Sequence, residues 1–248
     1  MNILRHIVNI IYPGICKLCG DTVSGDAVTS CFCNTCWEGI KWFDSPCCPR
    51  CGLPYPSMES LSNSCQAHEA HLCSSCHKNP PHFDSAISAG PYEGTLSEAI
   101  KLFKYKKKIH IGKALAHSII LHDPPLIKGD YIIPVPLHPR RLREREFNQS
   151  AIIALLLGRR LGIPLLTDVL IRHRHTKPQV ELDMMERSEN IRGVFTVKNG
   201  EKIAGKYILL IDDVMTTGST VNECSRMLKE NGASRVYVVT IARMVTSI

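Results

Sequence analysis

The chain of 248 residues lacks any apolar run near the roughly 20 residues that a transmembrane helix needs, so it predicts no membrane span. Its start also lacks a cationic segment followed by a small-residue cleavage site, and we therefore expect no signal peptide. Hydrophobic residues make up 44% of the chain, and the mean hydropathy is -0.04, which is typical of a globular protein. We expect a cytoplasmic protein, and a location at the inner face of the membrane is the alternative.

Other familiar signatures are missing as well. No Gly-Lys-Ser or Gly-Lys-Thr follows a glycine-rich loop, which excludes a Walker-type nucleotide site. Aromatic residues form only 6% of the chain, so few rings are available for stacking on nucleic-acid bases. The candidates are Phe103, Tyr105 and Phe147, and each could equally belong to the core. No internal repeat is present, so an array of repeated modules is not expected.

Cysteine and charge are both distributed unevenly. Eleven of the twelve cysteines fall between Cys16 and Cys76, and the first 83 residues carry 5 Lys and Arg against 6 Asp and Glu. The remaining residues carry 25 against 17, and a double proline within residues 77–82 indicates a linker. The sequence therefore predicts a Cys-rich zinc-binding module over residues 1–83 and a second domain over residues 84–248. The first module opens with a short amphipathic helix, indicated by apolar residues at Leu4, Ile7, Val8 and Ile11.

The cysteines form four Cys-x-x-Cys pairs. Two thiolates separated by two residues occupy one tight turn and fit adjacent corners of a zinc tetrahedron, so two pairs complete a site of four thiolates. Four pairs predict two structural zinc ions, and a zinc ion closed by four thiolates leaves no open position for catalysis. The predicted ligands are Cys16, Cys19, Cys33, Cys36, Cys48, Cys51, Cys73 and Cys76.

Some alternatives to this zinc arrangement stay open. Disulfides compete with zinc, although a reducing cytosol disfavours them, and a redox-active Cys-x-x-Cys would need one pair rather than four. Sequential sites have the lowest loop-closure entropy, but a cross-braced pairing of the turns is the other arrangement. One of His68, His71 and His77 could replace a late cysteine. The cysteines to which we assign no role are Cys31, Cys47 and Cys65.

Beyond the linker, short apolar runs alternate with segments of helical spacing. Unbroken apolar strands that alternate with helices predict an α/β domain, with a parallel sheet covered by helices on both faces. The predicted strands are residues 85–92, 131–135, 165–171, 207–211 and 236–242. The predicted helices cover residues 96–103, 111–121, 147–161 and 219–230.

A strand, a turn and a helix follow one another from residue 208 in a way that suits phosphate binding. The buried run Ile208–Ile211 is expected to end at Asp212 and Asp213, whose burial is costly unless something pairs with them. Residues 216–220 then open a helix, and the first N–H groups and the positive end of the helix dipole attract an anion. The two carboxylates can accept hydrogen bonds from sugar hydroxyls. Helix capping alone would need one Ser or Thr rather than four.

Residues 208–220 resemble the motif of type I phosphoribosyltransferases that binds phosphoribosyl pyrophosphate (PRPP). The resemblance implies that Asp212 and Asp213 are the catalytic residues, with their carboxylates on the ribose hydroxyls, and that Mg²⁺ accompanies PRPP. It also implies that residues 137–141 form the pyrophosphate loop, with Arg140 and Arg141 as its cations. The phosphate loop implied by the same resemblance consists of Met215, Thr216, Thr217, Gly218, Ser219 and Thr220.

The order of motifs resembles the ComF/GntX family, whose ComFC-type proteins are linked to DNA uptake in naturally competent bacteria. Cys-x-x-Cys pairs come first, followed by Phe103-Lys104-Tyr105 and then residues 134–141. One departure is Glu146, which stands where the family's Arg-Gly-Phe-Asn-Gln has glycine and puts the tightness of that turn in doubt. The motif residues that follow are Arg145, Phe147, Asn148, Gln149, Gln179, Arg187, Asn190 and residues 193–195.

Six lysines occur within residues 101–113 with no acid among them. A solvated basic face is the plain interpretation, whereas the family resemblance favours contact with the backbone of single-stranded DNA. Lys101, Lys104 and Lys108 could share one helix face. A long polar loop that starts at Arg172 could close over a bound ligand. The predicted DNA-binding residues are Lys101, Lys104, Lys107 and Lys108.

Two functional hypotheses follow. In the first, implied by the resemblance, the protein binds PRPP or another phosphorylated ribose and handles imported single-stranded DNA together with the DNA-uptake machinery. In the second, it is an active phosphoribosyltransferase that uses an unknown small-molecule acceptor and has no role with DNA. The sequence reveals neither an acceptor pocket nor a dedicated catalytic base, so it leaves open whether the protein is an enzyme.

Overall fold

The structure is a computed structural model, and it describes residues 14–23, 28–43, 46–55, 71–105, 108–122, 129–174, 176 and 190–245. None of the helices within these ranges is long and apolar enough to cross a bilayer. Several features named above lie outside the described residues: the N-terminal helix, Cys65, His68, Lys107, Gln179 and Arg187.

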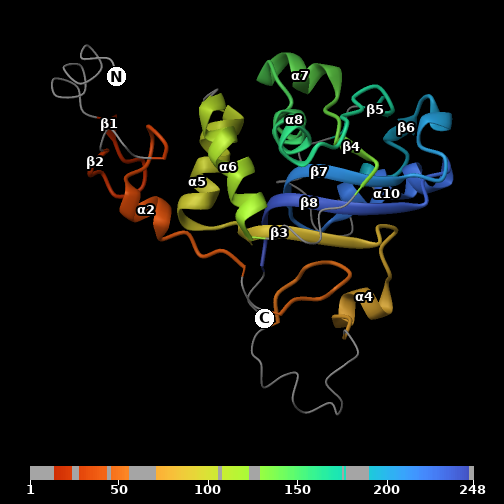
Figure 1. The fold of residues 1–248 in the computed structure, drawn as a ribbon, viewed down its shortest axis with the longest axis horizontal. Coiled ribbons are helices and arrows are strands. Elements are labelled where there is room, and N and C mark those ends of the chain that lie inside the picture. The colour runs from red at the N-terminus through yellow and green to blue at the C-terminus, as the bar shows by residue number, and fades with distance from the viewer. Residues whose placement is uncertain are drawn as a thin grey trace.

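Four parallel strands form the central sheet, in the spatial order β3, β8, β7 and β4 (Figure 1). They span Ser85–Pro91 (β3), Tyr131–Pro134 (β4), Tyr207–Met215 (β7) and Arg235–Arg243 (β8). Because β7 and β8 lie inside the sheet, their side chains alternate between two buried faces, which explains apolar runs such as Ile208–Ile211. The predicted parallel sheet is confirmed.

One face of the sheet packs against three helices. Leu209 and Ile211 of β7 belong to the buried cluster on this side. The last of the three helices begins two residues later than predicted, because the side-chain oxygen of Asn148 accepts a hydrogen bond from the N–H of Ser150 and caps it. The helices are α5 (Gly94–Tyr105), α6 (Ile109–His122) and α8 (Gln149–Leu161).

The other face of the sheet packs against helix α10 (Ser219–Glu230), whose bounds agree with the predicted helix. Ile208 and Leu210 of β7 point to this side, so the side chains of β7 alternate as a strand requires. A separate two-stranded antiparallel sheet lies on the same side and consists of β5 (Leu170–Arg172) and β6 (Phe195–Val197).

The predicted strand over residues 165–171 is wrong as a single strand. Leu165 makes one isolated parallel bridge to Ile132 at the edge of the main sheet, and β5 begins only at Leu170. Between them the chain bends at Asp168, whose carboxylate accepts hydrogen bonds from Lys202 (2.7 Å) and Asn199 (3.3 Å). This bend separates two extended pieces that look continuous in the sequence.

The N-terminal segment wraps around the β3 edge of the sheet. The backbone N–H of Phe43 donates to the carbonyl of Ala89 (2.9 Å), and a Cβ at Gly90 would lie 3.1 Å from the carbonyl oxygen of Lys41. Cys36 also contacts the start of helix α5, because its carbonyl accepts a hydrogen bond from Thr95 (2.9 Å). The small elements of this segment are β1 (Gly14–Ile15), β2 (Thr22–Val23), α2 (Asn34–Glu38) and α4 (Ser74–Lys78).

The buried core runs across the predicted boundary at residue 83. Phe32 and Trp37 belong to the cluster that contains α5, α6 and α8, whereas Cys48 and Phe83 belong to the cluster that contains α10. The N-terminal segment therefore contributes to the hydrophobic core on both faces of the sheet. Separate domains over residues 1–83 and 84–248 stay a prediction.

Glu146 ends the short helix α7 (Pro139–Arg145) in the left-handed conformation, with φ 66° and ψ −15°. This conformation costs an L-residue other than glycine roughly 1–2 kcal/mol. Replacing such a residue by glycine removes this strain, but the larger conformational entropy of glycine in the unfolded chain offsets about half of the gain in stability. We expect Glu146→Gly to raise the free energy of unfolding by about 0.5–1 kcal/mol, measured by urea denaturation.

Asn199 provides the matched control, because it also has a positive φ, of 53°. Asparagine tolerates the left-handed region better than glutamate does, so Asn199→Gly should give a smaller gain. A loss of stability in Glu146→Gly would show that contacts of the glutamate side chain outweigh the backbone strain.

Candidate functional site

Strand β7 extends past the end of its neighbour β4. Its pairing with β4 stops at Ile211, whereas its pairing with β8 continues to Met215. The expectation that the strand ends at Ile211 is wrong, because Asp212 and Val214 still pair with residues of β8. The two acids therefore lie on a strand that projects beyond β4, at the carboxyl edge of the sheet where open α/β sheets bind ligands.

Asp212 is held by groups from the helical layer. The hydroxyl of Ser150, in the first turn of α8, donates to Asp212 Oδ1 (3.0 Å), and the backbone N–H of Asp213 donates to the same oxygen (2.9 Å). Burial and, after it, the charge of Asp213 raise the pKa of Asp212 to about 7. Near neutral pH this carboxyl group exists as a mixture of neutral and charged forms.

Asp213 forms an ion pair with Lys104 of α5. The distance from Lys104 Nζ to Asp213 Oδ1 is 2.9 Å, and the two side chains are 15% and 13% exposed. Lys104 was predicted as a DNA-binding residue, but the structure places its ammonium group against an acid of the candidate site. The sequence signalled this lysine through Phe103-Lys104-Tyr105, although the spacing could not identify its partner.

The turn between β7 and α10 has the shape of a phosphate loop. Gly218 adopts φ 80°, and a Cβ in its place would lie 2.8 Å from Met215 Cε, so both the backbone angle and the space favour glycine. The hydroxyls of Thr217 and Ser219 lie 2.9 Å apart. No acidic residue occupies the first turn of α10, so the positive end of its dipole is not offset there.

A cavity of about 670 Å³ lies between this turn, the two acids and helix α5. Of the predicted cations, Arg141 lines the cavity, whereas Arg140 is exposed and pairs with Glu144 (3.3 Å). The predicted phosphate-loop residues that line it are Met215, Thr216, Gly218, Ser219 and Thr220, and Thr217 lines a second cavity behind the loop.

Arg172 also lines the cavity and was not among the predicted site residues. Its residue is 9% exposed, and its guanidinium lies 5.6 Å from the centre of the Phe195 ring. Within the described residues its Nε has no hydrogen-bond partner, which is unusual for a buried donor. The sequence placed Arg172 only at the start of a polar loop, because nothing in the pattern indicated its burial.

The predicted basic helix face is not formed as expected. Helix α5 ends at Tyr105, so Lys108 lies after the helix and is exposed. Lys101 forms an ion pair with Glu98 (2.7 Å), so its charge is partly balanced by an acid just outside residues 101–113. Arg145 donates to the Tyr105 hydroxyl (3.2 Å) and thereby links the end of α5 to α7.

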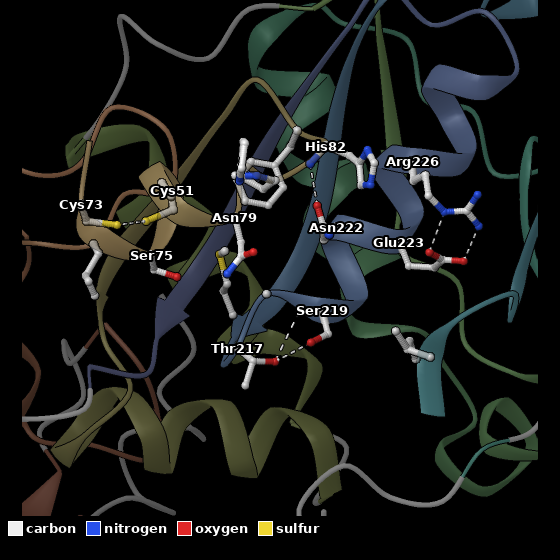
Figure 2. Close-up of a pocket in the computed structure, with 18 of the residues that line it drawn as sticks. Cys51, Cys73, Ser75, Asn79, His82, Thr217, Ser219, Asn222, Glu223 and Arg226 are labelled. Carbon is white, nitrogen blue, oxygen red and sulfur yellow. Dashed lines mark hydrogen bonds and ion pairs between the residues drawn. The ribbon is translucent and has the colours of Figure 1, made fainter. Parts of the chain in front are cut away.

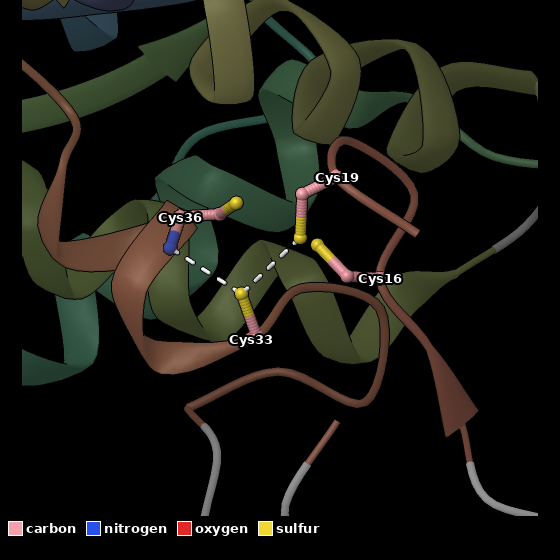
Figure 3. A group of neighbouring side chains, drawn as sticks. All are labelled: Cys16, Cys19, Cys33 and Cys36. Atoms are coloured by element: carbon pink, nitrogen blue, oxygen red, sulfur yellow. Dashed lines mark hydrogen bonds between the residues drawn. The ribbon is translucent and has the colours of Figure 1, made fainter. Parts of the chain in front are cut away.

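The cysteines gather in two groups of four. Within each group, all sulfur atoms lie within 4.8 Å of one another, and Figure 3 shows the sulfurs of the first group turned toward a common centre. The sequential pairing is found, so the cross-braced alternative is excluded. The groups are Cys16, Cys19, Cys33 and Cys36 (the first cluster), and Cys48, Cys51, Cys73 and Cys76 (the second cluster).

The geometry of both clusters fits a zinc ion. Zn–S bonds of about 2.3 Å place tetrahedral sulfurs roughly 3.8 Å apart, and Cys19 and Cys33, like Cys51 and Cys73, have sulfurs 3.7 Å apart. Burial raises the pKa of Cys48, but N–H groups that include that of Cys73 bring it down to about 7. Amides that stabilise a thiolate in this way are suited to metal binding.

Two family matches fall on these two parts of the chain. Residues 7–77 match the double zinc ribbon domain, and residues 148–246 match the phosphoribosyl transferase domain. The first range contains all eight cysteines of the two clusters, and the second contains β7, the loop and α10. The fold is therefore of the phosphoribosyltransferase type, with a parallel sheet flanked by helices, and it follows an N-terminal double zinc ribbon.

Three relatives align with nearly the whole chain. Competence protein F of Haemophilus influenzae is 32% identical over 218 residues, which cover 85% of this chain and 90% of that protein. DNA utilization protein YhgH of Shigella flexneri is 31% identical over 238 residues, which cover 93% of this chain and 97% of that protein. Competence protein ComFC of Bacillus subtilis is 26% identical over 249 residues, 94% of this chain and 96% of its own.

The raised pKa of Asp212 predicts a pH-dependent effect of Asp212→Asn on stability. In the wild-type protein this group binds its proton more tightly when folded, so its contribution to stability falls as pH rises from about 4 to about 7. Asparagine does not titrate. Relative to wild type, the variant should therefore gain on the order of 1–2 kcal/mol between about pH 5 and about pH 8, measured by urea denaturation.

Asp168 is the matched control, because it is exposed and its hydrogen bond from Lys202 lowers its pKa. Asp168→Asn should show no such gain at high pH. Parallel pH profiles for Asp212→Asn and the wild type would contradict the burial-raised pKa.

Proposed function

The chain belongs to the family of competence protein F, DNA utilization protein YhgH and competence protein ComFC, and on that basis we propose that it binds a phosphorylated ribose. PRPP is the ligand that the cavity suits best, and Mg²⁺ accompanies it. The second part of the proposal is that the protein handles single-stranded DNA during DNA uptake or use, in the cytoplasm.

One observation carries the first part: buried Asp213, partly buried Asp212 and the N-terminus of α10 line a single cavity. Asp212 and Asp213 are negative when ionised, whereas the loop at residues 216–220 lies at the positive end of the α10 dipole and attracts anions, so the cavity favours a ligand with hydroxyls at one end and a phosphate at the other. Its volume of about 670 Å³ lies within the usual range for small-molecule sites. A phosphorylated pentose has this distribution of groups.

Each side chain then has a defined role. Asp212 and Asp213 accept hydrogen bonds from the ribose hydroxyls, and the hydroxyls and amides of residues 216–220 hold the 5′-phosphate. Arg141, with Arg172 beside it, neutralises the pyrophosphate. Mg²⁺, when bound, adds positive charge to the pyrophosphate oxygens. Lys104 keeps the charge of Asp213 balanced while the cavity is empty of ligand.

An active phosphoribosyltransferase is the alternative function. The same acids would stabilise positive charge on the ribose ring as pyrophosphate leaves, and Arg141 would hold the leaving group. The acceptor is unknown, because the lining of the cavity does not single out a general base for it. Release of pyrophosphate from PRPP in the presence of candidate acceptors distinguishes this alternative from binding alone.

Calorimetry with PRPP tests the ligand. We expect binding that requires Mg²⁺ and that weakens by at least roughly tenfold in the double variant Asp212→Asn, Asp213→Asn, because loss of each charge-assisted hydrogen bond costs about 1.5–3 kcal/mol. Binding should also tighten as pH rises through about 7, because Asp212 loses its proton there.

The control for this experiment is Asp168→Asn, which removes an exposed acid away from the cavity. It should bind PRPP as the wild type does. Equal affinity in the double variant and the wild type would remove the two acids from the proposed ligand site.

The DNA part of the proposal rests on the relatives' names and on exposed basic residues. Lys108 follows α5, and Arg143 lies on the exposed helix α7, with the contact between Tyr105 and Arg145 joining the two segments. Lys101 extends the proposed surface, whereas Lys104 is paired with Asp213. Lys107 stays a predicted DNA-binding residue and lies outside the described residues. Basic side chains that follow a phosphate backbone bind it without reading the bases.

Salt dependence tests this surface. We expect the double variant Lys108→Glu, Arg143→Glu to lower the slope of log affinity against log salt by up to about 1.4 for a single-stranded oligonucleotide, since each lost phosphate contact removes about 0.7. Filter binding over a series of salt concentrations measures the slope. The matched control is Lys206→Glu, Arg235→Glu, at the opposite end of β7 and β8. An unchanged slope in the first variant would exclude this surface.

We also propose that both cysteine clusters hold structural zinc. Four thiolates at tetrahedral spacing support this, together with the double zinc ribbon match. Elemental analysis of protein purified under reducing conditions should find two zinc ions per chain. Cys19→Ser and Cys73→Ser should each reduce the count to one, and a folded protein without zinc would contradict the proposal.

A further inference from the structure

The second cysteine cluster lies beside the phosphate loop. A second cavity of about 710 Å³ separates them, lined by Cys51 and Cys73 on one side and by Thr217 and Ser219 on the other. Figure 2 shows these four side chains around the cavity, with α10 behind the hydroxyls. The two cavities share Met215, Gly218 and Ser219, so the loop is a wall between them.

Arg243 bridges the cluster and the loop. Its Nη1 donates to the backbone carbonyl of Cys51 and lies 3.3 Å from the sulfur of Met215, the last residue of β7. The residue is 8% exposed, and its Nε has no hydrogen-bond partner within the described residues. A guanidinium is costly to bury, so its placement here indicates a specific contact rather than general packing.

Met215 passes this contact on to the loop. Arg243 and Met215 are partners in the β7–β8 ladder, and the N–H of Met244 donates to the Met215 carbonyl (2.9 Å). The Met215 side chain fills the space in which a Cβ of Gly218 would lie. The left-handed turn at Gly218 that opens α10 is therefore packed directly on a residue that Arg243 holds.

A second contact fixes the same helix. The backbone N–H of His82 donates to the side-chain oxygen of Asn222 in the first turn of α10 (2.6 Å), as Figure 2 shows. His82 lies six positions after Cys76, the last cysteine of the cluster. On its other side the cluster rests on the sheet, because a Cβ at Gly52 would lie 2.4 Å from the carbonyl oxygen of Ala86.

We propose that the second cluster, when it holds its metal, braces the phosphate loop through Arg243. Loss of the metal releases the turn at Cys51, so Arg243 loses its carbonyl partner and the loop at residues 216–220 loses its fixed shape. Affinity for a phosphorylated ribose then falls although Asp212 and Asp213 are intact. This inference rests on the proposed function only for its effect on ligand affinity.

Within the described residues, no contact of this kind links the first cluster to the loop. Cys16 and Cys33 belong to the core on the opposite face of the sheet, with α5 and α6. Loss of its metal would disturb that face. The two clusters therefore differ in their connection to the ligand site, and the difference provides the internal control.

Hydrogen–deuterium exchange on the full chain tests the brace without any ligand. We expect the amides of residues 216–222 to exchange on the order of tenfold faster in Arg243→Met, because the contact that holds the turn is lost. Arg235→Met is the matched control at the other end of β8 and should leave these amides unchanged. Arg243→Lys keeps the positive charge but loses the several N–H donors of the guanidinium, so its exchange rate at residues 216–222 should lie between those of Arg243→Met and Arg235→Met.

The metal is tested in the same way. Cys73→Ser should accelerate exchange at residues 216–222 as Arg243→Met does, and combining the two substitutions should accelerate it little further. Cys19→Ser should leave these residues protected. If either Cys73→Ser or Arg243→Met fails to fold, chelator treatment of Cys19→Ser, in which only the second cluster is expected to hold zinc, followed by zinc addition, gives the comparison for the second cluster. Unchanged exchange at residues 216–222 after zinc removal from the second cluster would overturn the brace.

Ribose 5-phosphate affinity separates this inference from the proposed function. Calorimetry should show about tenfold weaker binding for Arg243→Met than for Arg235→Met. If the wild type does not bind ribose 5-phosphate or PRPP, the proposed function fails, while the exchange result still decides the brace. If the wild type binds and Arg243→Met binds equally well, the brace does not control the ligand site.

Discussion

The placement of two adjacent, mostly buried carboxylates at the end of β7 is the constraint on which the arrangement of the sheet and its helices depends. Asp212 and Asp213 are tolerable there only because α8 offers the Ser150 hydroxyl and α5 offers the Lys104 ammonium. Both partners come from the same helical layer. The packing of that layer therefore fixes the charge state of the site as well as the hydrophobic core, and the early end of β4 leaves the acids open to the cavity.

Much of this fold could be predicted where a local pattern fixes the outcome. The Cys-x-x-Cys spacing predicted the eight ligand cysteines, because a short turn leaves thiolates few geometries, but it left open which pairs share a site. The run from Ser219 predicted α10, because a glycine-linked start and an apolar stripe agree. The full length of β7 could not be predicted, because Asp212 and Asp213 interrupt its apolar pattern and only the pairing with β8 keeps them in the strand.

Contacts between side chains that are far apart in the sequence could not be predicted, for a different reason. Helical spacing assigns Lys104 to a face of α5 but does not say which strand that face meets. Arg172 and Arg243 look like ordinary basic residues, yet both are buried, because their environment is made by segments far away in the chain. Periodicity reports which residues are buried together, whereas the identity of the partner follows from topology.

The segment that crosses the edge of β3 has a further consequence. An outer strand with unpaired N–H and C=O groups can add a strand from another molecule, and proteins usually block such edges. Here the backbone near Lys41 and Phe43 occupies the rim, with Phe43 bonded to Ala89. The zinc ribbon thereby covers part of the edge at which a strand from another molecule could pair. A truncated protein without residues 1–83 would expose this edge of β3 and would be prone to aggregate.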